Sequence, residues 1–318
     1  MEDIRRWSLI AAFAPIMWGT AYYVTKTFLP ADYPLYGALI RALPAGLILL
    51  SVARSLPKGS WWWRSAILGT LNVGAFFILV YLAAQLLPSS VAATVMALSP
   101  MLMMLIAWPM LRQKPRMLPL AGAVLGFAGV VLMVASGSAA ANPVGLLASG
   151  GAMLMTSFGY ILTIRWSRLP QAPAVLPATA WQLTAGGLLL IPFAVIIEGA
   201  PPTLVASQWL GFAFLTIMAT ALAYLAWFAG LSKLQPGTLG LIGLLNPITG
   251  VIAGALLAHE RLSAPQLIGI AVVFSGIVLG QLAPAGTKSP RPAQEPLPAT
   301  GVAGNPYPGS ETRPTAHH

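Results

Sequence analysis

Ten apolar segments, each about the length of a membrane span, follow one another with only short polar connections between them. They cover residues 9–29, 35–52, 65–84, 89–111, 117–135, 143–164, 174–197, 208–231, 237–258 and 265–283. A helix needs about 20 such residues to cross the hydrocarbon layer of a bilayer. Segments of this length indicate helices, which satisfy all their backbone hydrogen bonds internally in lipid. We therefore predict an all-α integral membrane protein with ten transmembrane helices.

The charged residues agree with this prediction. They make up 8% of the chain, whereas a soluble domain has about 25%. The net charge of +10 comes largely from Lys and Arg in short connections between apolar segments. That pattern is typical of membrane orientation and not of a nucleic-acid groove. We expect a lipid bilayer as the surroundings and no nucleic acid as a partner.

The distribution of Lys and Arg also predicts the orientation in the membrane. With the N-terminus inside, the inner segments hold Arg5, Arg6, Arg54, Lys58, Arg64, Arg112, Lys114, Arg116, Arg165, Arg168, Lys233, Lys288, Arg291 and Arg313. The outer half holds Lys26, Arg41 and Arg261, together with the acids Asp32, Glu198 and Glu260. Because positive residues stay on the cytoplasmic side, we expect both termini to be cytoplasmic.

The two halves of the chain are similar to each other at shifts of 140 and 147 residues. The matched positions include Trp18 with Phe158, Pro30 with Pro170, Pro100 with Pro247, and Gly129 with Gly276. Each half holds five predicted helices, an odd number, so the second half must enter the membrane in the opposite orientation. This predicts two inverted repeats, residues 1–142 and 143–283, that form one transporter domain with a site at their interface.

Beyond residue 283 the composition changes. Residues 284–318 are rich in Pro, Gly, Ser and Thr and lack apolar periodicity, so we predict a disordered cytoplasmic tail. The final His317-His318 is interpreted as the remnant of a purification tag and not as a metal site.

Two corresponding segments are interrupted by proline. The stretch Gly240–Gly254 carries Asn246 and Pro247 at its middle, and Ser99-Pro100 interrupts the matching segment of the first half. A proline cannot donate to the carbonyl four residues earlier. Paired interruptions point to the binding site of a transporter, although small residues also serve close helix packing. We predict helix breaks at Pro100 and Pro247, with Ser99 and Asn246 either holding a substrate ammonium or amide or satisfying the freed carbonyls.

The motifs around these positions resemble a known family. Residues 18–26, Trp-Gly-Thr-Ala-Tyr-Tyr-Val-Thr-Lys, resemble the opening signature of EamA-type repeats, and Pro247 with residues 259–263, His-Glu-Arg-Leu-Ser, resembles the closing one. Over roughly residues 8–283 the chain is similar to the drug/metabolite transporter superfamily, and most like the YddG-type bacterial exporters of aromatic amino acids. The resemblance implies alternating access around a central cavity lined by both halves, with the fifth and tenth helices peripheral, and export of Phe, Tyr and Trp. It also implies a multi-pass location in a bacterial inner membrane.

Aromatic and hydroxyl side chains recur at helical spacing on three predicted helices. These stripes are Pro15, Trp18, Tyr22 and Thr25; Thr156, Tyr160, Thr163 and Ser167; and Thr216, Thr220, Tyr224 and Trp227, with Tyr81 on a further helix. Tyr and Trp rings suit stacking on an aromatic ring or an ammonium group, but they also form interfacial belts. Depth favours the cavity for Trp18, Tyr160 and Tyr224, whereas both interpretations stand equally for Tyr22 and Trp227. We predict substrate contacts from these five, Tyr81 and Thr163.

Arg41 is the strong charge that lies well inside a predicted span. An intramembrane arginine is a functional hypothesis by default, and its guanidinium suits bidentate binding of a substrate carboxylate. Its long side chain and its nearness to Pro34 also allow it to reach the outer headgroups. We include Arg41 in the predicted substrate site with both interpretations open.

Several residue types are absent where chemistry would need them. No Asp or Glu falls within a predicted membrane core, the chain has no cysteine, and it has no Gly-rich loop ending in Gly-Lys-Ser/Thr. We expect no catalytic residues, no metal and no cofactor, and therefore no enzyme. Export by facilitated diffusion or exchange is favoured over ion coupling. The alternatives are a broad-specificity multidrug or other-metabolite carrier and, disfavoured, an intramembrane enzyme; the chain is expected to act as a monomer or homodimer.

Overall fold

The computed structural model describes residues 2–112, 117–135, 142–234, 242–243 and 245–281, so the predicted tail lies outside the described residues. The first half contains α1 (Glu2–Phe28), α2 (Pro34–Ala53), α3 (Trp61–Gly69), η1 (Thr70–Gly74), α4 (Ala75–Leu86), α5 (Ser89–Met96), α6 (Ser99–Leu111) and α7 (Met117–Ala135). The second half contains α8 (Pro143–Trp166), α9 (Val175–Phe193), η3 (Ala194–Glu198), α10 (Ala206–Ala213), η4 (Phe214–Leu222), α11 (Ala223–Lys233), α13 (Leu245–Leu256) and α14 (Ala264–Gln281). The described residues hold no strand, which confirms the all-α prediction for them.

Many of these helices are apolar enough to cross a membrane. Six helical stretches meet both the length and the hydropathy that a span requires: Pro34–Ala53, Trp61–Leu86, Ser89–Leu111, Pro143–Trp166, Val175–Glu198 and Ala206–Gly230. Shorter apolar helices run over Leu120–Leu132, Leu245–Leu256 and Ala264–Leu279. The count of ten spans and the side on which the termini lie stay predictions.

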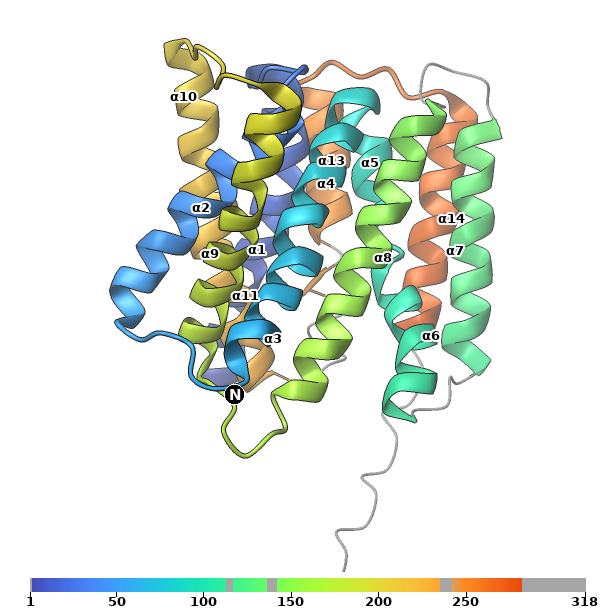
Figure 1. Cartoon of the computed structure of the whole chain (residues 1–318). Coiled ribbons are helices and arrows are strands. Elements are labelled where there is room, and N and C mark those ends of the chain that lie inside the picture. The colour runs from blue at the N-terminus through green and yellow to red at the C-terminus, as the bar shows by residue number, and fades with distance from the viewer. Residues whose placement is uncertain (1, 113–116, 136–141, 235–241, 244, 282–318) are drawn as a thin grey trace, which may run out of the picture. The chain divides into compact units, whose positions relative to one another are not determined.

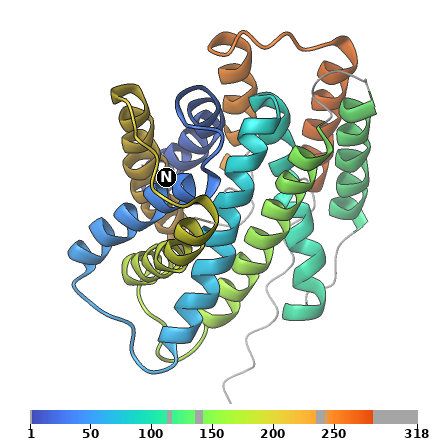
Figure 2. The same ribbon diagram turned by 45° about the horizontal axis from the view of Figure 1, so that its top comes forward.

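Each helix contact described here has a counterpart in which the helices of the first half and of the second half have exchanged roles. Helix α1 packs between α11 and α13, and α8 packs between α4 and α6 in the equivalent way, while α2 pairs with α9 and α7 with α14. Figure 1 and Figure 2 both show α7 and α14 side by side at one edge. This reciprocal pairing is what an inverted repeat requires. The division into two inverted repeats, residues 1–142 and 143–283, stays a prediction.

The pair α7–α14 meets backbone to backbone. A Cβ on Gly129 would lie 2.7 Å from the carbonyl oxygen of Gly269, and a Cβ on Gly276 would lie 2.5 Å from that of Gly122. Small residues allow this close approach between helices in lipid. The two contacts are reciprocal under the shift of 147 residues, so glycine is required at equivalent places in both halves.

The two ends of the helix bundle differ in charge. The described residues begin and end at the lower end in Figure 1, where the connections 54–60 and 167–174 also lie. We call this the basic end, because it carries Arg54, Lys58, Arg64, Arg165 and Arg168. The opposite end holds the connections 29–33, 199–205 and 257–263, and we call it the acidic end for Asp32, Glu198 and Glu260.

Two carboxylates at the acidic end cap helices of the other half. Glu198 accepts hydrogen bonds from the backbone N–H groups of Leu35 (2.6 Å) and Tyr36 (2.9 Å) at the start of α2. Glu260 accepts from the N–H groups of Ser89 (2.6 Å) and Ser90 (3.2 Å) and from the Ser90 hydroxyl (2.7 Å) at the start of α5. A carboxylate at a helix N-terminus satisfies free donors and complements the helix dipole. Both contacts therefore join the second half to the first.

Candidate functional site

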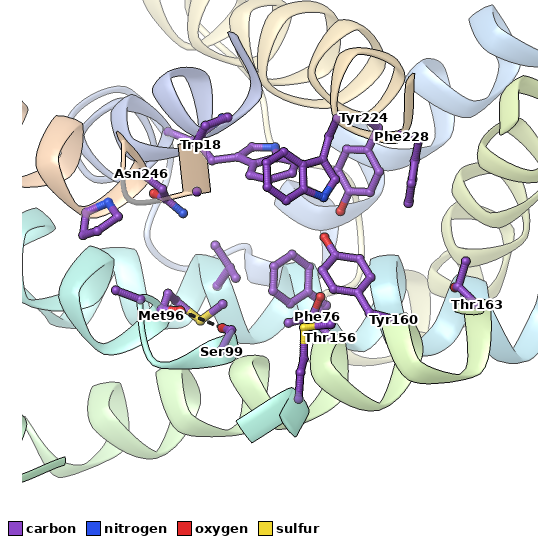
Figure 3. Close-up of a pocket in the computed structure, with 18 of the residues that line it drawn as sticks. Trp18, Phe76, Met96, Ser99, Thr156, Tyr160, Thr163, Tyr224, Phe228 and Asn246 are labelled. Carbon is purple, nitrogen blue, oxygen red and sulfur yellow. Dashed lines mark hydrogen bonds between the residues drawn. The ribbon is translucent and has the colours of Figure 1, made fainter. Parts of the chain in front are cut away.

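A cavity of about 620 Å³ lies between helices of both halves. Its walls include most of the residues predicted to contact substrate, namely Trp18, Tyr22, Arg41, Ser99, Tyr160, Thr163, Tyr224, Trp227 and Asn246, together with Pro247. Figure 3 shows that the labelled side chains converge from helices on opposite sides. The structure thus brings these residues to one space.

The cavity reaches the basic end of the bundle. Its lining includes Ser167 at the end of α8, Val175 at the start of α9 and Leu234 directly after α11. No described lining residue comes from the connections at the acidic end. There, Lys26 Nζ donates to the carbonyl of Leu87 (3.0 Å), which ties the end of α1 to the end of α4. The described structure is therefore accessible from the basic end and closed at the acidic end.

One wall of the cavity is a continuous set of aromatic rings. The Trp18 ring packs edge to face against Tyr224 and Trp227, with centroid distances of 5.7 Å and 5.5 Å. Phe228 lies 5.9 Å from Tyr224 and 6.5 Å from Tyr160, and the hydroxyl ends of the two tyrosines point towards each other (Figure 3). Edge-to-face packing fixes ring orientations and leaves flat apolar faces for a ligand.

The π-helical segment η4 holds both an aromatic ring and a charge of the site. The carbonyl oxygen of Ala219 accepts hydrogen bonds from Trp18 Nε1 (3.0 Å) and Arg41 Nη2 (3.4 Å). The next residue, Thr220, accepts from Arg41 Nε through its hydroxyl (2.8 Å). Turns of π-helix inside α-helices are frequent at functional sites. Here the segment positions two side chains that come from α1 and α2.

Arg41 lies inside the protein and does not reach the headgroups. It is 7% exposed, and its guanidinium carbon lies 4.1 Å from the centroid of the Phe77 ring. No described carboxylate forms an ion pair with it, and its Nη1 makes no hydrogen bond to the described residues. The structure therefore contradicts the outward interpretation of this side chain and leaves a buried positive charge at the cavity wall.

The first interrupted helix shows how its freed carbonyl is satisfied. Helix α5 ends at Met96 and α6 begins at Ser99, with Pro100 as its second residue. The Ser99 hydroxyl donates to the Met96 carbonyl (2.6 Å), so this serine serves the break itself. Of the two roles expected for Ser99, the structure therefore shows the satisfaction of a freed carbonyl.

The second interruption differs from the first. Helix α13 begins at Leu245, two residues before Pro247, and residues 235–241 and 244 lie outside the described part of the chain. The Asn246 side-chain oxygen is buried and has no hydrogen-bond partner among the described residues. An unpaired buried acceptor that lines a cavity is available to a donor on a ligand.

Tyr81 does not line the cavity. Its hydroxyl donates to the carbonyl of Pro30 (2.6 Å) at the acidic end, and its ring packs against Gly37 of α2. The neighbouring Val80 and Phe76 line the cavity instead. One residue along a helix turns the side chain by about 100°, so Tyr81 points away from the space that its neighbours reach.

Two aromatic residues of the wall were not predicted. Phe76 and Phe228 both line the cavity. Phe228 follows Tyr224 by four residues, and Phe76 precedes Val80 by four, so each shares a helix face with another lining residue. Helical spacing applied to purely apolar rings, and not only to Tyr and Trp, would have identified them.

Comparison with known proteins gives matches along nearly the whole described chain. The model of the EamA-like transporter family matches twice, at residues 5–135 and 144–280. Protein PecM of Dickeya dadantii (strain 3937) is 40% identical over 271 residues, which cover 85% of this chain and 91% of PecM. The uncharacterized transporter YvbV of Bacillus subtilis (strain 168) is 26% identical over 284 residues, covering 86% and 91% of the two chains.

More distant similarity extends to a bacterial inner membrane protein and to a solved fold. The uncharacterized inner membrane transporter YedA of Escherichia coli (strain K12) is 25% identical over 269 residues, covering 83% of this chain and 87% of YedA. A crystal structure at 21% identity aligns with a TM-score of 0.60 over 86% of this chain and 96% of its own. At that identity the last similarity concerns the fold alone.

Proposed function

The chain belongs to the EamA-like transporter family, and from this premise we propose that it exports small aromatic metabolites that carry a carboxylate. Aromatic amino acids are the reference substrates, and alternating access is the mechanism. The cavity volume of about 620 Å³ falls within the range of about 300–1,000 Å³ that small-molecule sites occupy. The two family matches and the named transporters among its relatives support membrane transport itself.

The observation that carries the proposal is the pairing of an aromatic wall with a buried arginine. The rings of Trp18 and Tyr224 line the cavity, and Arg41 lies close to Trp18 because both side chains donate to the carbonyl of Ala219. An aromatic ring gains from stacking on such faces, and a carboxylate gains a charge-assisted hydrogen bond from the guanidinium. A substrate with both groups satisfies both features.

The accessible side of the cavity fits the direction of transport. If the basic end is cytoplasmic, as the Lys and Arg distribution predicts, the described state loads from the cytoplasm. The described lining of the cavity contains no acidic residue, so a carboxylate proton relay of the usual kind has no described residue to use. We therefore propose facilitated diffusion or exchange.

The alternative within transport is a carrier of broad specificity. Met96 and Met103 line the cavity, and methionine adapts to ligands of different shapes. Such a carrier would accept cationic dyes and aromatic acids at similar rates. Equal transport of both classes in vesicles would favour this alternative.

The test is the flux of labelled tryptophan from liposomes that contain the purified protein. We expect saturable flux that phenylalanine inhibits and that a pH gradient leaves unchanged. Trp18→Ala should abolish most of it, because Trp18 anchors the aromatic wall. Trp209→Ala is the matched control, since Trp209 is 56% exposed on α10 and lies outside the cavity. Equal flux from both variants would refute the proposed site, and absence of any aromatic flux would refute the substrate class.

A further inference from the structure

We infer that the cavity selects net anions. Its preferred cargo is an aromatic acid without an α-ammonium group, and the interior-negative membrane potential drives its export. This inference rests on the proposed function for the aromatic nature of the cargo. It adds the charge of the cargo and the source of the driving force.

The first step is the charge of the cavity. The seven acidic residues of the chain are Glu2, Asp3, Asp32, Glu198, Glu260, Glu295 and Glu311. The described lining of the cavity contains no acidic residue, and Glu198 and Glu260 cap helices at the acidic end. Among the described lining residues Arg41 alone carries a formal charge. This positive charge is not neutralised by any described side chain, and a bound carboxylate would neutralise it.

The second step is the separation of Arg41 from the unpaired acceptor. Helix α1 packs between α11 and α13. On one side Trp18 shares the Ala219 carbonyl with Arg41. On the other side α1 contacts α13, where a Cβ on Gly19 would lie 2.5 Å from the Asn246 carbonyl oxygen. Figure 3 shows Asn246 set apart from the ring cluster that Trp18 joins. Arg41 and Asn246 thus come from different helices, α2 and α13, and approach different residues of α1.

The charge of Arg41 disfavours an α-amino acid. The ammonium and the carboxylate of an amino acid are bonded to the same carbon, so an ammonium beside an Arg41-bound carboxylate lies near the guanidinium. Two unit positive charges about 6 Å apart at an effective dielectric constant of about 20 weaken binding by about 100-fold. The Asn246 oxygen instead suits an N–H or O–H on the far edge of the aromatic ring, such as that of an indole or a phenol.

The third step is the driving force. A carrier that completes a cycle returns to its starting state, so the net charge moved is the charge of the cargo. For a monovalent anion, an interior-negative potential of about 100 mV sustains an outside-to-inside ratio of about 50. Export against a gradient then needs no acidic coupling residue, in agreement with a described cavity lining that contains none.

The experiment compares three indoles that differ only in charge: indole-3-propionate (net −1), tryptophan (net 0) and tryptamine (net +1). Each is loaded into liposomes with and without the full-length protein. We expect protein-dependent efflux of indole-3-propionate to exceed that of tryptophan by at least about tenfold, which allows for screening of the repulsion by water. Tryptamine should show no protein-dependent efflux.

Variants of Arg41 test the source of this selectivity. Arg41→Gln should remove the preference for the acid, and Arg41→Lys should retain a preference because it keeps the charge. Arg261→Gln is the matched control, since Arg261 is an exposed cation of the acidic end that does not line the cavity. Retention of the preference in a folded Arg41→Gln variant would overturn the inference.

The driving force is tested with a potassium gradient of about 50-fold, outward directed, and valinomycin. The resulting interior-negative potential should raise the final outside-to-inside ratio of indole-3-propionate to about 50 and leave that of tryptophan near 1. Efflux of tryptophan as fast as that of the acid, or a ratio insensitive to potential, would overturn the inference while the proposed function stands. Absence of protein-dependent flux for all three indoles would overturn both.

Discussion

Replacement of Glu260 by Gln tests how the acidic end stays closed. The carboxylate accepts hydrogen bonds from two backbone N–H groups at the start of α5 and from the Ser90 hydroxyl. Glutamine keeps one acceptor oxygen but loses the charge and the second oxygen. A hydrogen bond to a charged group contributes about 1.5–3 kcal/mol, and the interaction with the helix dipole about 0.3–1 kcal/mol. We expect Glu260→Gln to destabilise the closed acidic end by about 2 kcal/mol.

This loss sets the size of the functional effect. If the contact breaks when the acidic end opens, a loss of about 2 kcal/mol raises the population of the open state about 30-fold. The assay uses Val80→Cys, because the chain has no native cysteine and Val80 lines the cavity. A membrane-impermeant maleimide applied to the predicted external face should label this cysteine about 30 times faster in the Glu260→Gln background.

The control for this experiment is Asp32→Asn. Asp32 is an exposed acid of the same end, and its carboxylate makes no hydrogen bond to the described residues. The Asp32→Asn substitution should leave the labelling rate of the cysteine at position 80 unchanged. A Glu260→Gln protein that is folded and labelled at the parental rate would refute the role of this cap in closing the acidic end.

Two further predictions concern stability in detergent. Gly276→Ala should lower the free energy of unfolding by about 1–3 kcal/mol, because the new Cβ would lie 2.5 Å from a backbone oxygen. The measurement is the melting temperature, which should fall. Gly150→Ala is the control and should melt like the parent protein, because a Cβ at Gly150 meets nothing within 4 Å. Gln182→Leu should lower the free energy of unfolding by about 1–3 kcal/mol, because the buried Asn72 amide would lose the Gln182 oxygen to which it donates at 2.9 Å. A melting temperature equal to that of the parent protein would show that water reaches the Asn72 amide.

The sequence was a good guide to the helices and to the helix faces that carry polar aromatic residues. Trp18, Tyr160 and Tyr224 lie on the cavity wall, where their depth and spacing placed them. Those properties depend on local periodicity, which the sequence contains. The family resemblance likewise indicated a cavity between two halves, and the EamA matches confirm the family though not the aromatic-exporter subtype.

The position of the Arg41 side chain could not be predicted, because its partners are remote in the chain. Thr220, which accepts a hydrogen bond from Arg41, follows Arg41 by 179 residues. Thr220 also belongs to a π-helical segment that no sequence pattern indicated. Tyr81 shows that residue type alone can also suggest a site contact that the structure does not have. Its residue type suggested a ligand contact, but the rotation of its helix directs it to the Pro30 carbonyl.

The shared carbonyl of Ala219 has a consequence for how tightly the protein can hold its cargo during a cycle. This oxygen belongs to the second half, whereas Trp18 and Arg41 belong to the first. Any rocking of one half against the other that displaces this oxygen removes support from the ring and the charge in one step. Under the alternating access that we propose, opening to the far side and loss of affinity for the cargo would be a single event, and no separate signal would be needed for release.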